Sequence, residues 1–104
     1  MTDHPAYLRW TPADTIEHDD GMINVIADCY QRRDGKWQWT AQFAAYKVTF
    51  DTHGNSTDTL GPFLSSGPQF ADTEAAARAR CEWWIEKARC DRLGLTFMKE
   101  APRD

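Results

Sequence analysis

The chain lacks the motifs by which most enzymes and membrane proteins are recognised. Its 104 residues contain no repeat, no low-complexity tract and no apolar run near the roughly 18 to 20 residues that a membrane helix needs. The first residues do not place a basic segment before an apolar one, so we expect no signal peptide. These absences predict a protein without membrane contact, located in the cytoplasm.

Cysteine is also scarce. The three cysteines, Cys29, Cys81 and Cys90, form no Cys-x-x-Cys pair, and their odd number favours small core residues over a disulfide framework. A cysteine nucleophile needs a positioned histidine, whereas the three histidines lie in polar or turn-like segments. We therefore expect a non-enzymatic protein with no catalytic residue, no metal site and no cofactor.

A surplus of positive charge is missing as well. The net charge is −4, and residues 1–20 account for all of it, with five acidic residues against one arginine. Acidic and basic residues are equal in number both in residues 21–70 and in residues 71–104. Proteins that bind nucleic acid without sequence preference are usually basic, so the composition weighs against that class.

The strongest pattern is that of a helix over residues 72–94. Asp72 is a suitable N-cap, with Thr73 as the second candidate, and Gly94 can end the helix in the left-handed conformation. Spacing at about 100° per residue places an apolar stripe on one side of this helix. The stripe consists of Ala77, Cys81, Trp84, Ile85 and Ala88. We expect it to pack on an apolar surface.

Trp83 lies outside this stripe, on the side of the helix that holds Ala76 and Ala79. Two interpretations remain open. In the first, the ring is covered by Trp10, Leu95 or Phe97. In the second, the ring is exposed and binds a partner protein or a second copy of the chain, since tryptophan is over-represented among the residues that dominate interfaces.

Asp34-Gly35 is a strong hairpin signal between two long β-prone segments. A two-residue turn would mix polar and apolar side chains on each face, whereas the three-residue loop Arg33-Asp34-Gly35 segregates them. With that loop, one face holds Ile23, Val25, Ala27, Cys29, Trp39, Ala41, Phe43 and Ala45. We therefore predict an antiparallel hairpin whose apolar face receives the helix.

Residues 46–70 are predicted to extend the sheet and then to leave it. The alternation of apolar residues changes phase near Ala45-Tyr46, which favours a bulge or bend there. Ser56–Leu60 is expected to form a polar strand at the sheet edge. The Gly-Pro pairs at 61–62 and 67–68 indicate a linker that leads to the helix.

Hydrophobic residues make up 41% of the chain, enough for one core, and we expect a single α+β domain over residues 22–98. It consists of an antiparallel sheet of three or more strands with one long C-terminal helix packed across one face. Residues 1–21 are set apart as an acidic N-terminal extension, in which Thr11-Pro12 indicates the start of a short helix. Residues 99–104 are expected to form a polar tail.

The acidic residues of the N-terminal extension are the first candidates for contact with a partner. They are Asp14, Glu17, Asp19 and Asp20. The spacing of a calcium-binding loop is absent. The pattern therefore favours a solvated turn, or an acidic patch for a basic partner, over a metal site.

The polar face of the hairpin suggests a different function, because long polar side chains on a twisted sheet can enter the major groove of DNA. Gly35-Lys36-Trp37-Gln38-Trp39 and Phe70-Ala71-Asp72-Thr73-Glu74-Ala75-Ala76 resemble the second strand and the helix start of the arm-type DNA-binding domain of phage integrases. The resemblance implies DNA-backbone contacts from Arg32, Arg33 and Lys36, and base contacts from Gln38, Thr40 and Gln42. The third strand lacks a basic residue, a departure that favours a solvated sheet face.

A small acidic domain with many aromatic residues and no catalytic set is also similar in style to proteins of phages and mobile elements, including anti-CRISPR inhibitors. That resemblance implies a protein target and a location in the host cytoplasm. We predict a phage or mobile-element protein that acts by binding a protein, with Trp83 and the four acidic residues as its contacts. A sequence-specific DNA-binding domain is the alternative.

Overall fold

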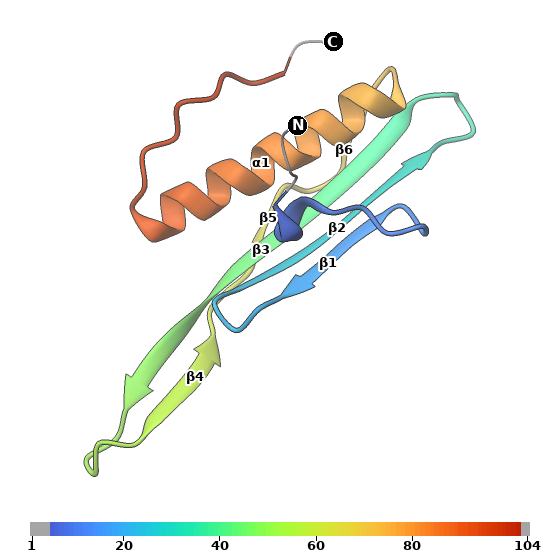
Figure 1. The fold of residues 1–104 in the computed structure, drawn as a ribbon. Helices are drawn as coiled ribbons and strands as arrows, with labels where there is room; N and C mark the ends of the chain where they lie inside the picture. The colour runs from blue at the N-terminus through green and yellow to red at the C-terminus, as the bar shows by residue number, and fades with distance from the viewer. Residues whose placement is uncertain (1–4, 103–104) are drawn as a thin grey trace.

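The structure, a computed structural model, describes residues 5–102 and consists of one antiparallel sheet and one long helix (Figure 1). Its elements in chain order are η1 (Ala6–Leu8, a 3-10 helix), β1 (Thr15–Asp19), β2 (Ile23–Gln31), β3 (Trp37–Phe50), β4 (Ser56–Leu60), β5 (Leu64–Ser65), β6 (Gln69–Ala71) and α1 (Glu74–Leu93). The strand order is β1-β2-β3-β4, and β5 and β6 also pair with β3. The predicted α+β architecture is confirmed.

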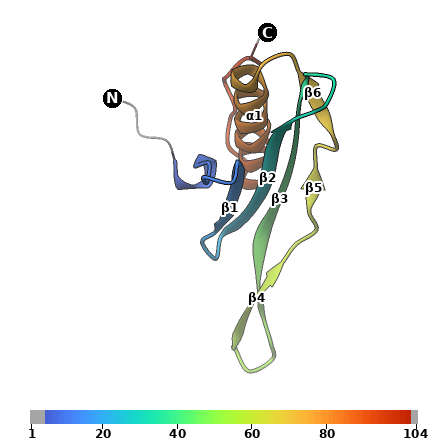
Figure 2. The same ribbon diagram turned by 90° about the vertical axis from the view of Figure 1, so that its right-hand side faces the viewer.

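The helix α1 lies on one side of the sheet (Figure 2). Thr73, the second candidate, is its N-cap, because the Thr73 Oγ1 atom accepts a hydrogen bond from the Ala76 N–H at 3.1 Å. Gly94 ends the helix with a φ of 69°, as predicted. Four of the five residues of the apolar stripe are buried, and the fifth, Trp84, packs half-buried against the core.

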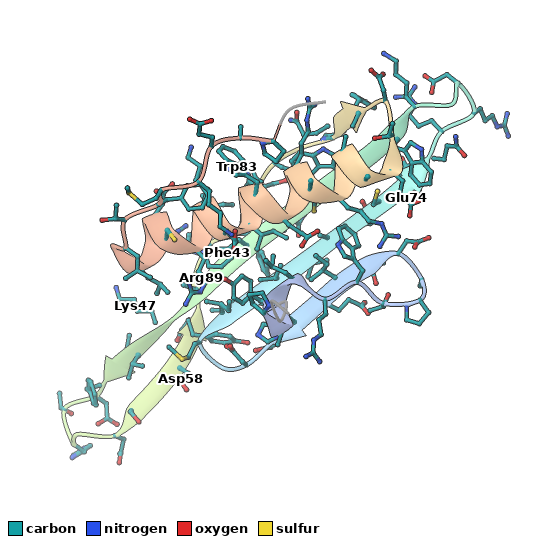
Figure 3. All side chains as sticks on the ribbon, turned by 45° about the horizontal axis from the view of Figure 1, so that its top comes forward. Phe43, Lys47, Asp58, Glu74, Trp83 and Arg89 are labelled. Atoms are coloured by element: carbon teal, nitrogen blue, oxygen red, sulfur yellow. The ribbon has the colours of Figure 1, made fainter. Side chains whose placement is uncertain are left out.

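The β2–β3 hairpin has the predicted register. Val25 lies opposite Phe43 and Cys29 opposite Trp39, and the loop ends at Gly35 with a φ of 88°. The predicted apolar face is turned toward α1, and Figure 3 shows Phe43 on β3 beneath the helix. Phe43 is completely buried, so the contact of β3 with α1 forms the centre of the core.

The edge of the sheet beyond β3 is one strand broken in two places. Trp39 pairs with Gln69, and Gln42 pairs with Ser65. An interval of three residues along β3 is therefore matched by an interval of four residues along the edge strand. The same excess of one residue separates the pair Phe43–Leu64 from the pair Tyr46–Leu60. Each break contains a Gly-Pro pair, and proline, which has no N–H to donate, is tolerated at such bulges. The predicted linker is thus part of the sheet.

A two-stranded hairpin of residues 46–60, which we call the arm, projects beyond the end of α1 (Figure 1). It makes the protein elongated, with extents of 57, 29 and 26 Å. The radius of gyration of 15.6 Å exceeds the value of about 13 Å expected for a compact domain of this length. No residue of the arm is buried, so the arm adds nothing to the core.

The predicted bulge near Ala45-Tyr46 is absent from β3, which is continuous over residues 37–50. The Tyr46 N–H donates to the Met22 carbonyl at 2.9 Å, in the register of the preceding pair Ile23–Ala45. Even-numbered residues therefore keep the same face along the strand. The apolar residues change face because α1 ends before the arm and no longer offers a surface to pack on.

Residues 5–21 contribute to the same core as the rest of the chain. The short helix predicted after Thr11 is wrong, because β1 occupies residues 15–19 and the Thr11 Oγ1 atom accepts two backbone N–H groups of the turn before it. Leu8 and Ile16 are buried, with 4% and 1% of their surface exposed. The composition therefore separated, as an acidic extension, a segment whose residues 5–21 contribute to the domain core.

Candidate functional site

The sheet face that points away from α1, which we call the open face, is covered by no helix among residues 5–102 (Figure 2). Directly paired residues of antiparallel strands lie on the same face, so the strand registers define rows of side chains across it. One row consists of Glu17, Ile26 and Gln42. The next rows consist of Thr15, Asp28 and Thr40, and of Tyr30, Gln38 and Phe70.

Large apolar side chains are exposed on this open face. Ile26, Tyr30 and Phe70 expose 46%, 47% and 42% of their surfaces. Val48 and Phe50 continue the same face along the arm and expose 53% and 71%. Removing such groups from water lowers the free energy, so covering the open face with a partner would be favourable.

Carboxylates lie among these apolar groups. Glu17 and Asp19 come from β1, and Asp28 comes from β2. Basic residues of this face lie at the hairpin tip, where the Arg32 guanidinium stacks 4.8 Å from the centre of the Phe70 ring. The middle of the open face is therefore negatively charged, while its hairpin end carries positive charge.

The predicted base-reading residues, Gln38, Thr40 and Gln42, do lie together on the open face, as alternate residues of β3. Asp28 is paired with Thr40, as the predicted register requires, and the strand that the sequence did not reveal, β1, adds Glu17 to this face. Carboxylates at these positions would face the phosphates of a docked duplex. The predicted backbone contacts, Arg32, Arg33 and Lys36, stay at the hairpin tip.

The four acidic residues predicted as one patch lie in three separate places of the structure. Asp14 forms an ion pair with Arg78 of α1 at 2.6 Å. Asp19 accepts a hydrogen bond from the Tyr46 hydroxyl at 2.7 Å, which is the largest of the causes that lower its pKa. Glu17 stands on the open face, and Asp20 belongs to the turn between β1 and β2.

Asp20 organises that turn. Its Oδ1 atom accepts the N–H groups of Ile23 at 2.9 Å and Met22 at 2.8 Å, and His18 Nε2 lies 3.0 Å from the other carboxylate oxygen. The hydrogen bond from the Ile23 N–H, followed by that from His18, lowers the pKa of Asp20 to about 2. The carboxylate therefore holds the β1–β2 connection while it is ionised.

We expect Asp20→Ala to lower the free energy of unfolding by about 1 kcal/mol at neutral pH, because two turn N–H groups lose their acceptor. The pKa of Asp20 is lower in the folded than in the unfolded chain, so its stabilisation is complete above about pH 4 and is lost as the pH falls toward about 2. Urea unfolding across that range should show the wild-type and Asp20→Ala stabilities converging. Asp20→Asn, which keeps an acceptor oxygen, is the matched control and should cost less at neutral pH.

Trp83 is covered by the segment that follows α1, which agrees with the first of the two interpretations. Its ring meets the Phe97 ring edge to face at 5.7 Å between centroids, and its Nε1–H donates to the Lys99 carbonyl at 3.2 Å. The Lys99 ammonium pairs with Glu86 at 2.8 Å, which ties the segment to the helix a second time. Figure 3 shows Trp83 on the side of α1 that faces this segment.

The thiols of the core are poor candidates for nucleophiles. Burial raises the pKa of Cys29 to about 11 and raises the pKa of Cys81 still further, so both remain protonated at neutral pH. Within residues 5–102, no three His, Cys, Asp or Glu side chains form a group that could hold a metal ion. In the same part of the chain, no helix is both long enough and apolar enough to cross a bilayer.

The contact residues predicted from the sequence did not include Ile26, Phe70, Val48 or Phe50 of the open face. Ile26 interrupts an otherwise polar face, and Val48 and Phe50 alternate in phase with it, which was the available signal. The missing information was that β1 pairs with β2, so that Glu17 and Ile26 become neighbours. That pairing joins residues nine positions apart into one surface.

Comparison with known proteins gives no relative to add to this geometry: no protein-family model matches the chain, and no curated protein or solved structure matches it significantly.

Proposed function

We propose that this protein is a non-enzymatic binding protein that docks on a protein target through the open face and the adjoining arm. The observation that carries the proposal is the exposure of Ile26, Tyr30, Phe70, Val48 and Phe50 on one uncovered sheet face. A projecting two-stranded hairpin is marginally stable by itself, and contact with a partner would stabilise it. Such a surface suits a protein partner, whose side chains can fill the spaces between the rows.

Charge favours this function over the two competing ones. A DNA duplex would bring phosphates against Glu17 and Asp28, which are unfavourable neighbours for an anion. A two-fold dimer centred on the middle of the open face would bring these carboxylates close to their own copies. Sequence-specific DNA binding stays the alternative, with backbone contacts from Arg32, Arg33 and Lys36 and base contacts from the polar residues Gln38, Thr40 and Gln42 of the sheet face.

We further propose that the protein acts as an inhibitor, of the kind that its small acidic composition resembles in phages and mobile elements. A rigid sheet face that covers a functional surface of its target needs no catalytic residue. Glu17 and Asp19 remain proposed contact residues. Trp83 is less suited to that role because Phe97 and Lys99 already occupy it.

The proposal is tested by capture of a target with the tagged full-length chain, comparing the wild type with Ile26→Ser/Tyr30→Ser. Both side chains are nearly half exposed, so the double variant should stay folded and lose at least roughly tenfold in affinity, a typical effect for removing two central apolar contacts. Asp91→Ala, at an exposed position of α1, is the matched control and should bind like the wild type. Equal binding by all three proteins would rule out the open face.

A further inference from the structure

Two carboxylates flank one apolar side chain in the middle of the open face. Glu17 lies directly opposite Ile26, and Asp28 is the next residue of β2 on the same face. These side chains line a depression of about 190 Å³, together with Thr40 and Gln42 of β3. That is smaller than the roughly 300 Å³ at which pockets for small molecules begin, and a single long side chain fits it better than a cofactor does.

Neither carboxylate is neutralised within the described part of the chain. Glu17 and Asp28 form no ion pair with residues 5–102, whereas Asp14, Asp20 and Glu86 all have basic or histidine partners there. Both side chains are exposed, so water hydrates them in the free protein. The depression is therefore an uncompensated negative site with an apolar floor.

We propose that this depression receives an arginine side chain of the protein target, an inference that rests on the proposed function. The guanidinium group presents five N–H donors in a plane and can bind two carboxylates at once. Its three methylene groups can cover Ile26 while the charged end stays between Glu17 and Asp28. The polar atoms of Thr40 and Gln42 offer further acceptors on the β3 side. The target is thus a protein whose docking surface displays arginine beside apolar residues.

A second copy of the chain is a poorer occupant. A two-fold contact centred on the depression would bring Glu17 and Asp28 close to the Glu17 and Asp28 of the second copy. The arm adds one lysine and two aspartates, Lys47, Asp51 and Asp58, so it offers no positive surface to the depression either. Figure 3 shows Lys47 and Asp58 on the two strands of the arm, away from the centre of the sheet.

The direct test is a titration of the isotope-labelled full-length chain, followed by NMR, with the peptide Ac-Gly-Thr-Val-Arg-Val-Thr-Gly-amide. Two matched peptides carry glutamine or glutamate in place of arginine. We expect saturable shifts at the amides of Glu17, Ile26 and Asp28 with the arginine peptide, and binding at least roughly tenfold weaker with the glutamine and glutamate peptides. Added salt should weaken the arginine complex.

The variant Glu17→Gln/Asp28→Asn keeps both side-chain shapes and removes both charges. Its remaining amide signals should match the wild type, which shows that it is folded, and its affinity for the arginine peptide should fall at least roughly tenfold. No saturable shift up to about 10 mM peptide, equal binding of the arginine and glutamine peptides, shifts confined to another surface, or self-association of the chain would each overturn the inference. If the charge-neutral variant still captures a target that Ile26→Ser/Tyr30→Ser loses, the proposed function stands and the arginine site does not.

Discussion

Replacement of Phe43 by alanine is expected to lower the free energy of unfolding by about 3 to 5 kcal/mol. Phe43 is the largest of the fully buried side chains and lies where β3 meets α1. Its removal loses the transfer free energy of the ring and leaves a cavity, because the helix and the sheet on either side are both rigid. For a domain with a typical total stability of about 5 to 15 kcal/mol, this single change consumes a large share of the total.

Urea unfolding, followed by tryptophan fluorescence, measures this loss. Val48→Ala is the matched control on the same strand, because Val48 is 53% exposed and lies in the arm, outside the core. Its expected effect stays within about 0.5 kcal/mol. A loss below about 1 kcal/mol for Phe43→Ala would mean that α1 does not pack on β3 as described.

Ile16→Ala is expected to cost about 2 to 5 kcal/mol, although Ile16 lies in the segment that composition marks as an acidic extension. Its side chain is 1% exposed and belongs to the same core cluster as Phe43. The loss would detach β1 from the core face and would weaken the support of the β1–β2 turn. Thermal or urea unfolding of the full-length chain gives the value.

Glu17→Ala, one residue further along β1, is the control for this second prediction. Glu17 is exposed on the open face, so its truncation should change stability by no more than about 0.5 kcal/mol. Equal and small effects of Ile16→Ala and Glu17→Ala would show that β1 is only loosely attached. A large difference between neighbouring residues is what a strand with one buried face requires.

Sequence periodicity was sufficient for the parts of the fold that are governed by local chemistry. The hairpin register followed from Gly35 and from the segregation of apolar residues, and the helix end followed from Gly94, while the N-cap is Thr73, one residue after the first candidate Asp72. The predicted apolar stripe of the helix is confirmed for the same reason, and Trp84 lies at the margin of the stripe. In these cases one short segment contains all the information that decides the structure.

Long-range pairing explains what the sequence did not reveal. β1 is a short strand with charged and polar residues on its outer face, and Thr11-Pro12 before it is a good helix start, so its pairing with β2 was hidden. The fragments β5 and β6 have only two and three residues, too few to show alternation. The open face depends on both facts, because its rows combine residues from β1, β2, β3 and β6.

The two breaks in the edge strand have a consequence for how the arm can vary. Each break already absorbs one extra residue without disturbing the pairs on either side of it. An insertion or deletion in residues 51–55, at the tip of the arm, would change the length of a hairpin that contributes no core residue. Any resulting slip would end at Gly61-Pro62, before it reached β6 or α1. The arm can therefore change in length and sequence while the body of the protein keeps its register.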